Sequence, residues 1–209
     1  IMLKFFQERN RLEAGIDEVG RGCLAGRVYA AAVVWPNRIE DYDYSIIKDS
    51  KKLSDKKKII AKHYIEENAI DYAVGWVDEK TIDKINILQA SQRAMHKALD
   101  NLSVVPDYLL VDGNYFRPYM DKNDNYVSFD CITKGDNEFI SIAAASVLAK
   151  VARDQYIVDL VKENPEYEKY GWLKNKSYGT KQHLDAIKKY GITPHHRTTF
   201  GICKKYKHF

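Results

Sequence analysis

The residues with the clearest chemical potential are two adjacent carboxylates, Asp17 and Glu18, at the end of an apolar stretch. An unpaired carboxylate is strongly disfavoured in a protein interior, so burying both of them requires a compensating charge. Oxygen ligands suit Mg²⁺ or Mn²⁺, which makes this pair a candidate cation site. The segment Gly20-Arg21-Gly22 follows directly. Because glycine has no Cβ, its backbone can approach a bulky ligand closely.

Two further acids stand at the ends of other predicted elements. Asp112 follows the apolar run 108–111, and Asp136 precedes a helical pattern. Taken singly, each fits an ordinary turn-forming or helix-capping residue. Together with the first pair they make four acids at element ends, which is where ligands bind in open α/β sheets. Four acids gathered there would hold two metal ions, one to activate water and one to stabilise the leaving oxygen of a phosphodiester.

Strand geometry sets a condition on the first pair. Successive side chains of a strand point to opposite faces of the sheet. Asp17 and Glu18 therefore cannot both face one site from a regular strand. We expect the strand to end or twist at Glu18, where a backbone carbonyl is a further candidate ligand.

The apolar pattern predicts a mixed α/β fold that would position these acids. Strand-like runs cover 12–16, 27–35, 72–77, 108–111 and 126–132. Helical spacing covers 53–68, 79–100, 140–151 and 180–190. We therefore expect a mixed β-sheet flanked by helices in a single domain, 1–209. Its α/β core would span roughly 12–160 and its C-terminal helical segment roughly 161–209.

Length and composition fit a soluble globular chain of 209 residues. No apolar run reaches membrane-spanning length, and no basic-then-apolar signal segment opens the chain. We expect a cytoplasmic monomer without a membrane partner. Three widely separated cysteines, Cys23, Cys131 and Cys203, are interpreted as free thiols in a reducing compartment. The basic, aromatic tail 203–209 is either a disordered end or a docking segment, and we favour disorder.

Several short motifs follow one another in a fixed order: Gly-Ile-Asp-Glu-Val-Gly-Arg-Gly (15–22), Asp-Ser-Lys-Lys-Leu-Ser (49–54), Leu-Val-Asp-Gly-Asn (110–114), Lys-Gly-Asp (134–136), Ser-Ile-Ala-Ala-Ala-Ser-Val-Leu-Ala-Lys-Val-Ala-Arg-Asp (141–154), Tyr-Gly-Thr-Lys-Gln-His-Leu (178–184) and Tyr-Gly-Ile-Thr-Pro-His-His-Arg (190–197). Together they resemble the ribonuclease HII family, the type 2 ribonucleases H. The resemblance covers the chain from about residue 12 to 200.

The resemblance implies a ribonuclease H-like fold and cleavage of RNA within RNA–DNA hybrids. It also implies cutting on the 5′ side of single ribonucleotides embedded in duplex DNA, leaving 3′-hydroxyl and 5′-phosphate ends, with Mg²⁺ or Mn²⁺. The family's metal-binding acids fall on Asp17, Glu18, Asp112 and Asp136. Its loop that reads the ribose 2′-hydroxyl falls on Gly20, Arg21 and Gly22, and its sugar-stacking tyrosine falls on Tyr178.

Physical chemistry supports these roles. The 2′-hydroxyl is what separates RNA from DNA at a given nucleotide, and a bare backbone can contact it directly. Arg21 could instead make a plain phosphate contact. Lys51 and Lys52 are candidate phosphate contacts, although a solvated lysine patch fits equally well. Ser146 could reach the nucleic acid or only pack, and we favour packing.

The chain departs from the family pattern at a few positions. Cys23 and Arg27 stand where prolines are usual, Ser177 stands where a glycine usually precedes the tyrosine, and Val19 replaces an alanine. None of them is a ligand, so the chemistry should survive.

Three alternatives bear on this assignment. The related ribonuclease HIII family has an extra N-terminal domain, for which the sixteen residues before Asp17 are too few. A binding module without catalysis would gain nothing from clustered acids. An unrelated metal nuclease or resolvase on the same fold would differ in its substrates, because it would cut an all-DNA duplex equally well. Contact with a replication clamp is left open.

Overall fold

The computed structural model describes residues 2–37, 44–47 and 53–206. Its described strands form one mixed sheet in the order β3-β2-β1-β4-β6-β5. β1 pairs antiparallel with β2 and parallel with β4, and β4 pairs parallel with β6. The predicted α/β fold is confirmed. The strands are β1 (Glu13–Val19), β2 (Val28–Val34), β3 (Asp71–Val77), β4 (Tyr108–Asp112), β5 (Tyr119–Met120) and β6 (Tyr126–Ile132).

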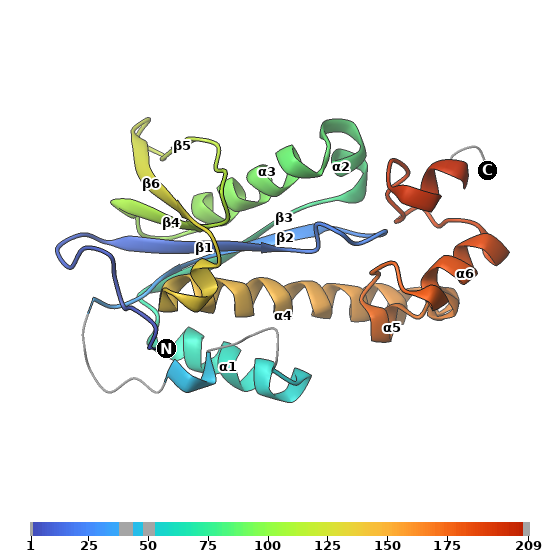
Figure 1. Cartoon of the computed structure of the whole chain (residues 1–209), viewed down its shortest axis with the longest axis horizontal. Coiled ribbons are helices and arrows are strands. Elements are labelled where there is room, and N and C mark those ends of the chain that lie inside the picture. Colours follow the sequence, from blue (N-terminus) through green and yellow to red (C-terminus); the bar gives the residue numbers. More distant parts are fainter. Residues whose placement is uncertain (1, 38–43, 48–52, 207–209) are drawn as a thin grey trace.

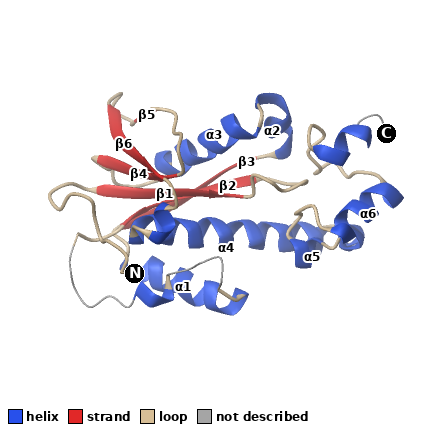
Figure 2. Ribbon diagram, in the orientation of Figure 1, coloured by secondary structure: helices blue, strands red, loops and turns tan. Residues whose placement is uncertain are grey.

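Helices cover both faces of the sheet, as Figures 1 and 2 show. α2 (Glu79–Ile85) and α3 (Ile87–Asp100) lie on one face, and α1 (Asp55–Asn68) and the long α4 (Ile140–Glu163) lie on the other. The C-terminal part gathers at one end of α4. It consists of η4 (Pro165–Tyr170), α5 (Trp172–Asn175), α6 (Lys181–Tyr190) and η5 (Gly201–Tyr206). Among the described residues outside this part, η1 (Tyr44–Ile46) and η3 (Gly135–Asn137) are short 3-10 turns.

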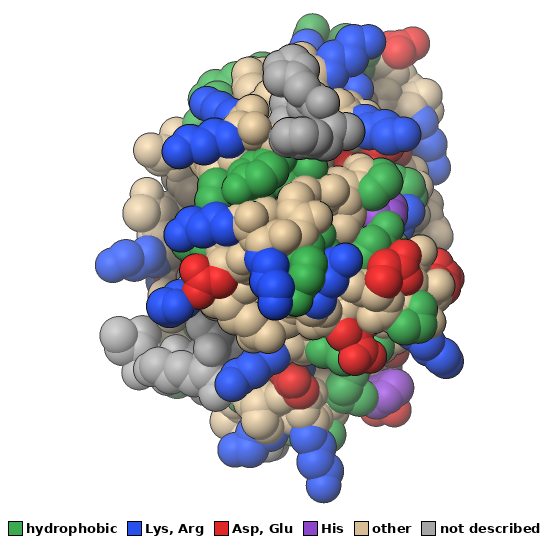
Figure 3. All heavy atoms as spheres, turned by 90° about the vertical axis from the view of Figure 1, so that its right-hand side faces the viewer, with side chains coloured by type: hydrophobic (Ala, Val, Ile, Leu, Met, Phe, Trp, Pro, Cys, Tyr) green, Lys and Arg blue, Asp and Glu red, His purple; other side chains and the backbone are tan. Residues whose placement is uncertain are grey.

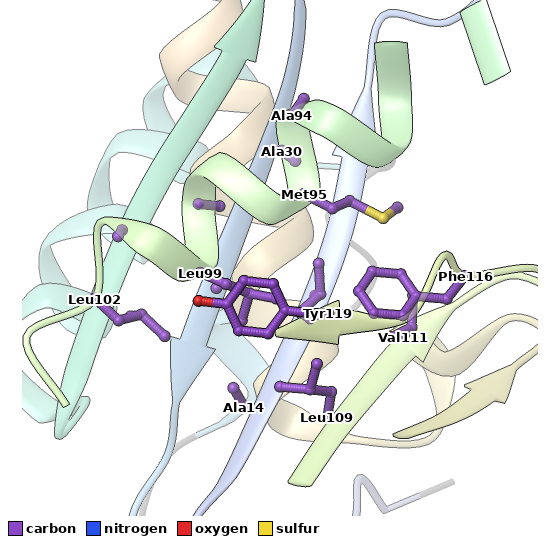
Figure 4. Close-up of a cluster of buried hydrophobic side chains, with 14 of the residues drawn as sticks. Ala14, Ala30, Ala94, Met95, Leu99, Leu102, Leu109, Val111, Phe116 and Tyr119 are labelled. Atoms are coloured by element: carbon purple, nitrogen blue, oxygen red, sulfur yellow. The ribbon is translucent and has the colours of Figure 1, made fainter. Parts of the chain in front are cut away.

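Each face of the sheet has its own apolar core. Between the sheet and α3, Met95 and Leu99 pack with Leu109 and Val111 of β4 (Figure 4). On the opposite face, small side chains such as Ala144 let α4 lie close to the sheet. A Cβ added at Gly15 of β1 would lie 2.3 Å from the backbone carbon of Ser141. The close seat of α4 on β1 therefore depends on this glycine.

The C-terminal segment shares a third apolar cluster with the rest of the molecule. Trp172, Ile187 and Cys203 pack there with Ile157 of α4 and with Ala25 from the loop between β1 and β2. This packing brings the C-terminal segment against the loop between β1 and β2, which contains Gly20 and Gly22.

Three sequence predictions differ from the structure. The helix predicted over 79–100 is two helices, because Asn86 has a φ of +68° and its side chain accepts the N–H of Gln89 to begin α3. β1 continues in register to Val19 rather than ending at Glu18. The tail is ordered as far as residue 206, since η5 buries Cys203 in the third cluster.

Other expectations agree with the structure. All three cysteines are free. The helices predicted over 53–68 and 180–190 are α1 and α6, and the side chains of Ser54 and Thr180 cap them. Within the described ranges, no helix combines the length and the apolar character needed to cross a membrane.

Candidate active site

The first two acids of the site lie on neighbouring parallel strands. Gly15 pairs with Leu110 and Ile16 pairs with Val111, so the next positions in register are Asp17 and Asp112. Parallel strands lie roughly 4.8 Å apart, and side chains in register share a face. That face is the one covered by α4, because Leu110 packs against Ile142. The fold therefore places the two carboxylates side by side at the carboxyl ends of β1 and β4.

The surroundings of Asp17 disfavour its charge. Its side chain is 6% exposed. Burial, and then the charges of Asp112 and Glu18, raise the pKa of Asp17 well above its usual value. The Ser146 side chain hydrogen-bonds to this carboxylate, and the Glu18 N–H donates to its Oδ1 at 2.8 Å. Ser146 is thus a buried partner of a catalytic candidate rather than a simple packing residue.

Glu18 points to the other face of β1, as the alternation of a regular strand requires. Its Oε1 lies 3.5 Å from Nη1 of Arg21. Burial raises the pKa of Glu18, and Asp112 adds to this effect while Arg21 opposes it. Glu18 therefore joins the other acids electrostatically at the strand end, without the strand break that the sequence suggested.

Asp136 lies in η3, on the turn between β6 and α4. The N–H of the preceding Gly135 donates to Oδ1 of Asp112 at 2.7 Å. This bond fixes the Asp112 carboxylate and holds the Asp136 turn against the end of β4. Across the described part of the chain, no group of three or more Asp, Glu, His or Cys side chains forms a ready-made metal cage.

The donor chemistry nevertheless fits hard divalent cations. The acids supply only oxygen ligands, as Mg²⁺ and Mn²⁺ prefer. Two N–H groups and one hydroxyl already orient Asp17 and Asp112. Burial is the main cause of the raised pKa values of Asp17 and Glu18, and the charge of Asp112 adds to both, so a bound cation would stabilise the ionised carboxylates.

The segment Gly20-Arg21-Gly22, called here the glycine loop, is supported by two buried arginines, Arg153 and Arg197. Gly20 has a φ of +91°, and a Cβ there would lie 2.3 Å from Nε of Arg153. Arg153 donates to the carbonyls of Ala25 and Arg27, and Arg197 donates to those of Gly20, Arg21 and Gly26. Gly22 is exposed and has open space around it. The loop thus presents its outer face on a rigid base.

Sequence reasoning did not single out Arg153 and Arg197. Both are 0% exposed, whereas arginine is mostly found at protein surfaces. Their partners are mainly backbone carbonyls, which leave no trace in a residue pattern. The available signal was the position of each inside a quoted motif, Arg153 in 141–154 and Arg197 in 190–197.

Tyr178 lies beside the glycine loop, just before α6. Its side chain is 38% exposed, and its ring centroid is 5.9 Å from Nζ of Lys150. His183 Nδ1 lies 2.9 Å from the Tyr178 carbonyl oxygen. Lys51 and Lys52 lie outside the described residues. The structure therefore brings together the acids, the glycine loop and Tyr178.

Solved structures share this architecture. The ribonuclease H2 of Pyrococcus horikoshii aligns with a TM-score of 0.75 and 25% identity, over 93% of this chain and 96% of that one. Bst-RNase HIII in complex with Mn²⁺ aligns with a TM-score of 0.68 over 93% of this chain and 68% of that one. Because its identity is 20%, that likeness shows the fold alone. The fold and the acids at its strand ends define a nuclease of the ribonuclease H-like class.

Sequence comparison narrows the class to one family. A family model described as Ribonuclease HII matches residues 14–203. The ribonuclease HII of Parabacteroides distasonis is 51% identical over 201 residues, which cover 96% of each chain. The chain belongs to the ribonuclease HII family, as its motifs predicted. It is a metal-dependent endoribonuclease that acts on RNA–DNA hybrids.

Proposed function

We propose that this enzyme also cuts duplex DNA on the 5′ side of a single embedded ribonucleotide, by two-metal-ion catalysis that leaves 3′-hydroxyl and 5′-phosphate ends. One observation carries the proposal. Asp17 and Asp112 stand in register at the ends of parallel strands, with Glu18 close enough to shift the Asp17 pKa, directly beside the glycine loop.

Asp17, Asp112 and Asp136 would hold the cations, Mg²⁺ or Mn²⁺, with their carboxylates. Glu18, whose side chain leaves β1 on the other face, would contribute its backbone carbonyl. When bound, two such ions supply a nucleophilic water and stabilise the charge that develops on the leaving oxygen. The protein's own share is orientation. The hydroxyl of Ser146 and the N–H of Gly135 fix the Asp17 and Asp112 carboxylates before substrate arrives.

Substrate choice would come from two neighbouring surfaces. The Gly20-Arg21-Gly22 backbone would contact the ribose 2′-hydroxyl with no side chain in the way. The exposed part of the Tyr178 ring would pack on the sugar of the next nucleotide, where an extra hydroxyl would clash. Together they would favour a ribose followed by a deoxyribose.

Basic side chains near these surfaces suit a phosphate backbone. Figure 3 shows Lys and Arg side chains, interleaved with hydrophobic ones, over the end of the molecule that carries α6. Arg21, Lys181 and Lys188 are well exposed, with side-chain exposures of 49%, 91% and 63%. These groups, with Lys51 and Lys52, would position the duplex without reading its sequence.

We also propose that residues 1–209 work as a single catalytic domain. The third apolar cluster supports this proposal, because it joins Trp172 and Ile187 of the C-terminal segment to Ala25 of the loop between β1 and β2. A C-terminal segment cut away from this cluster would leave the loop without its buried support.

The decisive experiment uses a DNA duplex that contains one ribonucleotide, with Mg²⁺ or Mn²⁺. We expect a single cut 5′ of the ribonucleotide, with no cutting of the all-DNA duplex. Asp112→Asn should lower the rate by about 10³-fold, since it weakens cation binding worth several kcal/mol at the transition state. It should bind the duplex normally, because no phosphate contact is removed.

Matched controls make the result specific. Asp100→Asn, at the exposed end of α3, should cut at the wild-type rate. Equal cutting of all-DNA duplex would favour an unrelated nuclease, and binding without cutting would favour a non-catalytic module. A wild-type rate for Asp112→Asn would show that the site is misassigned.

A further inference from the structure

Two segments that are distant in sequence lie against each other between the glycine loop and Tyr178. The N–H of Leu24 donates to the carbonyl of Ser177 at 2.9 Å. The thiol of Cys23 donates to the carbonyl of Lys176, with the sulfur 3.7 Å from the oxygen. Residues 23–25 and 176–178 are therefore one packed unit, called here the brace.

Ser177 connects the two segments of the brace to each other and to the buried Arg153. Its hydroxyl donates to the carbonyl of Ala25 at 2.8 Å and accepts a hydrogen bond from Nη2 of Arg153 at 2.8 Å. Its φ is +69°, a conformation that costs a non-glycine residue about 1 kcal/mol or more. The hydroxyl, which is 0% exposed with its residue, offsets that cost with two buried hydrogen bonds.

Cys23 ties the brace to the tyrosine ring. It is 0% exposed, and its thiol lies close enough to the side chain of Tyr178 to add to the effect of burial, which raises the pKa of that phenol. His183 Nδ1 lies 2.9 Å from the backbone carbonyl oxygen of Tyr178 and fixes the main chain that carries the ring. Tyr178 is thus held at its main chain and meets Cys23 at its side chain, while 38% of its surface stays open to a substrate.

We propose that Cys23 and Ser177 are positioning residues that fix the Tyr178 ring relative to the glycine loop, and so set the preference for an RNA–DNA junction over a continuous hybrid. This inference rests on the proposed function. A junction must place a ribose on the loop and a deoxyribose on the ring at the same time. Its cleavage therefore depends on the distance between the two surfaces.

A continuous hybrid makes a different demand. It has a ribose at both places, so it gains nothing from a fixed ring and loses little when the ring moves. Both side chains lie at the same boundary, where residues 23–25 meet residues 176–178. The brace is thus a property of this chain's own side chains.

The test compares kcat/KM on a single-ribonucleotide duplex with kcat/KM on a continuous hybrid, and takes their ratio as the readout. Tyr178→Ala should lower the ratio most. Cys23→Ala and Tyr178→Phe, which remove the contact between thiol and phenol, and Ser177→Gly, which removes two hydrogen bonds, should each lower it by about 3- to 10-fold. Cys23→Ser replaces the thiol with a hydroxyl, which is also a donor and an acceptor, and its ratio should stay within about 2-fold of the wild-type ratio.

A double-mutant cycle separates positioning from general damage. Cys23→Ala added to Tyr178→Phe should lower the ratio no further, because both remove the same side-chain contact. Cys131→Ala, the same change on β6, should leave the ratio unchanged. Additive effects, or an unchanged ratio in Cys23→Ala and Ser177→Gly while Tyr178→Ala lowers it, would overturn the inference alone. A wild-type enzyme without any junction preference would overturn the proposed function as well.

Discussion

The two halves of the candidate site are built on opposite physical principles. The acid half, formed by Asp17, Glu18 and Asp112, concentrates like charges in a partly buried place, and burial raises the pKa values of Asp17 and Glu18. The reading half, formed by the glycine loop and Tyr178, is supported by hydrogen bonds from Arg197 to the loop carbonyls and from Arg153 to Ser177, next to the tyrosine. The acid half needs positive charge from bound cations. The reading half takes its supporting hydrogen bonds from the protein itself.

This contrast assigns different work to each half. Mutual repulsion among carboxylates is expected in a site that binds cations. Carboxylates whose charge was already neutralised by protein groups would bind cations weakly. A surface that discriminates a single hydroxyl needs a fixed shape instead.

The largest expected effect on stability is the loss of Arg197. Arg197→Met would leave the carbonyls of Gly20, Arg21 and Gly26 without their buried donor. We expect the free energy of unfolding to fall by about 3 kcal/mol or more, measured by urea denaturation. Arg93→Met, on the exposed side of α3, should change it by less than about 0.5 kcal/mol. Equal effects of the two changes would show that the loop is not held by its base.

How much of this division the sequence could reveal depends on the kind of interaction. Asp17 and Asp112 follow apolar runs, so their place at strand ends was predictable, and the parallel register of β1 and β4 confirms that they are neighbours. The break at Asn86 was not predictable, because apolar spacing continues through it and only its positive φ ends α2.

The reading half was harder to predict. A motif located the glycine loop and Tyr178, but the contacts that hold them run from side chains to backbone carbonyls 20 or more residues away, as from Arg153 to Lys176 and Ala25. Such contacts depend on the path of the chain rather than on a residue pattern. Ser146 was interpreted as packing for the same reason, since its hydrogen bond to Asp17 exists only once α4 lies on β1.

A smaller effect should appear with pH in the histidines behind Tyr178. Nδ1 of His196 accepts the N–H of Thr193, so its Nε2 donates to Nε2 of His183, 3.0 Å away. His183 Nδ1 is then the donor to the Tyr178 carbonyl. Both rings are neutral in this arrangement. Burial, then His183 and His195, lower the pKa of His196 to about 3, and burial lowers the pKa of His183.

The sign of the pH effect follows from these shifts. An unfolded histidine titrates near pH 6.5, about the ordinary value. Between that pH and about pH 3, the unfolded chain binds more protons than the folded one. The free energy of unfolding should therefore fall as the pH falls, by up to about 1.4 kcal/mol per pH unit for each histidine. His196→Gln should flatten this slope in urea denaturation between pH 7 and 4, whereas exposed His63→Gln should not. An unchanged slope in His196→Gln would mean that the buried pair does not stay neutral.

The smallest expected effect has the opposite sign and tests the acid half. Asp17→Asn removes a buried charge next to Asp112 and Glu18, so without divalent cations it should raise the free energy of unfolding by about 1 kcal/mol. Asp185→Asn, which removes an exposed carboxylate 2.6 Å from Lys181, should bring no such gain. With excess Mn²⁺ the order should change, because cation binding stabilises the wild type more than the variant. Urea denaturation in a chelator and in Mn²⁺ measures both effects. If Asp17→Asn were less stable than wild type in the chelator, the acids would not be under the mutual repulsion that makes them a cation site.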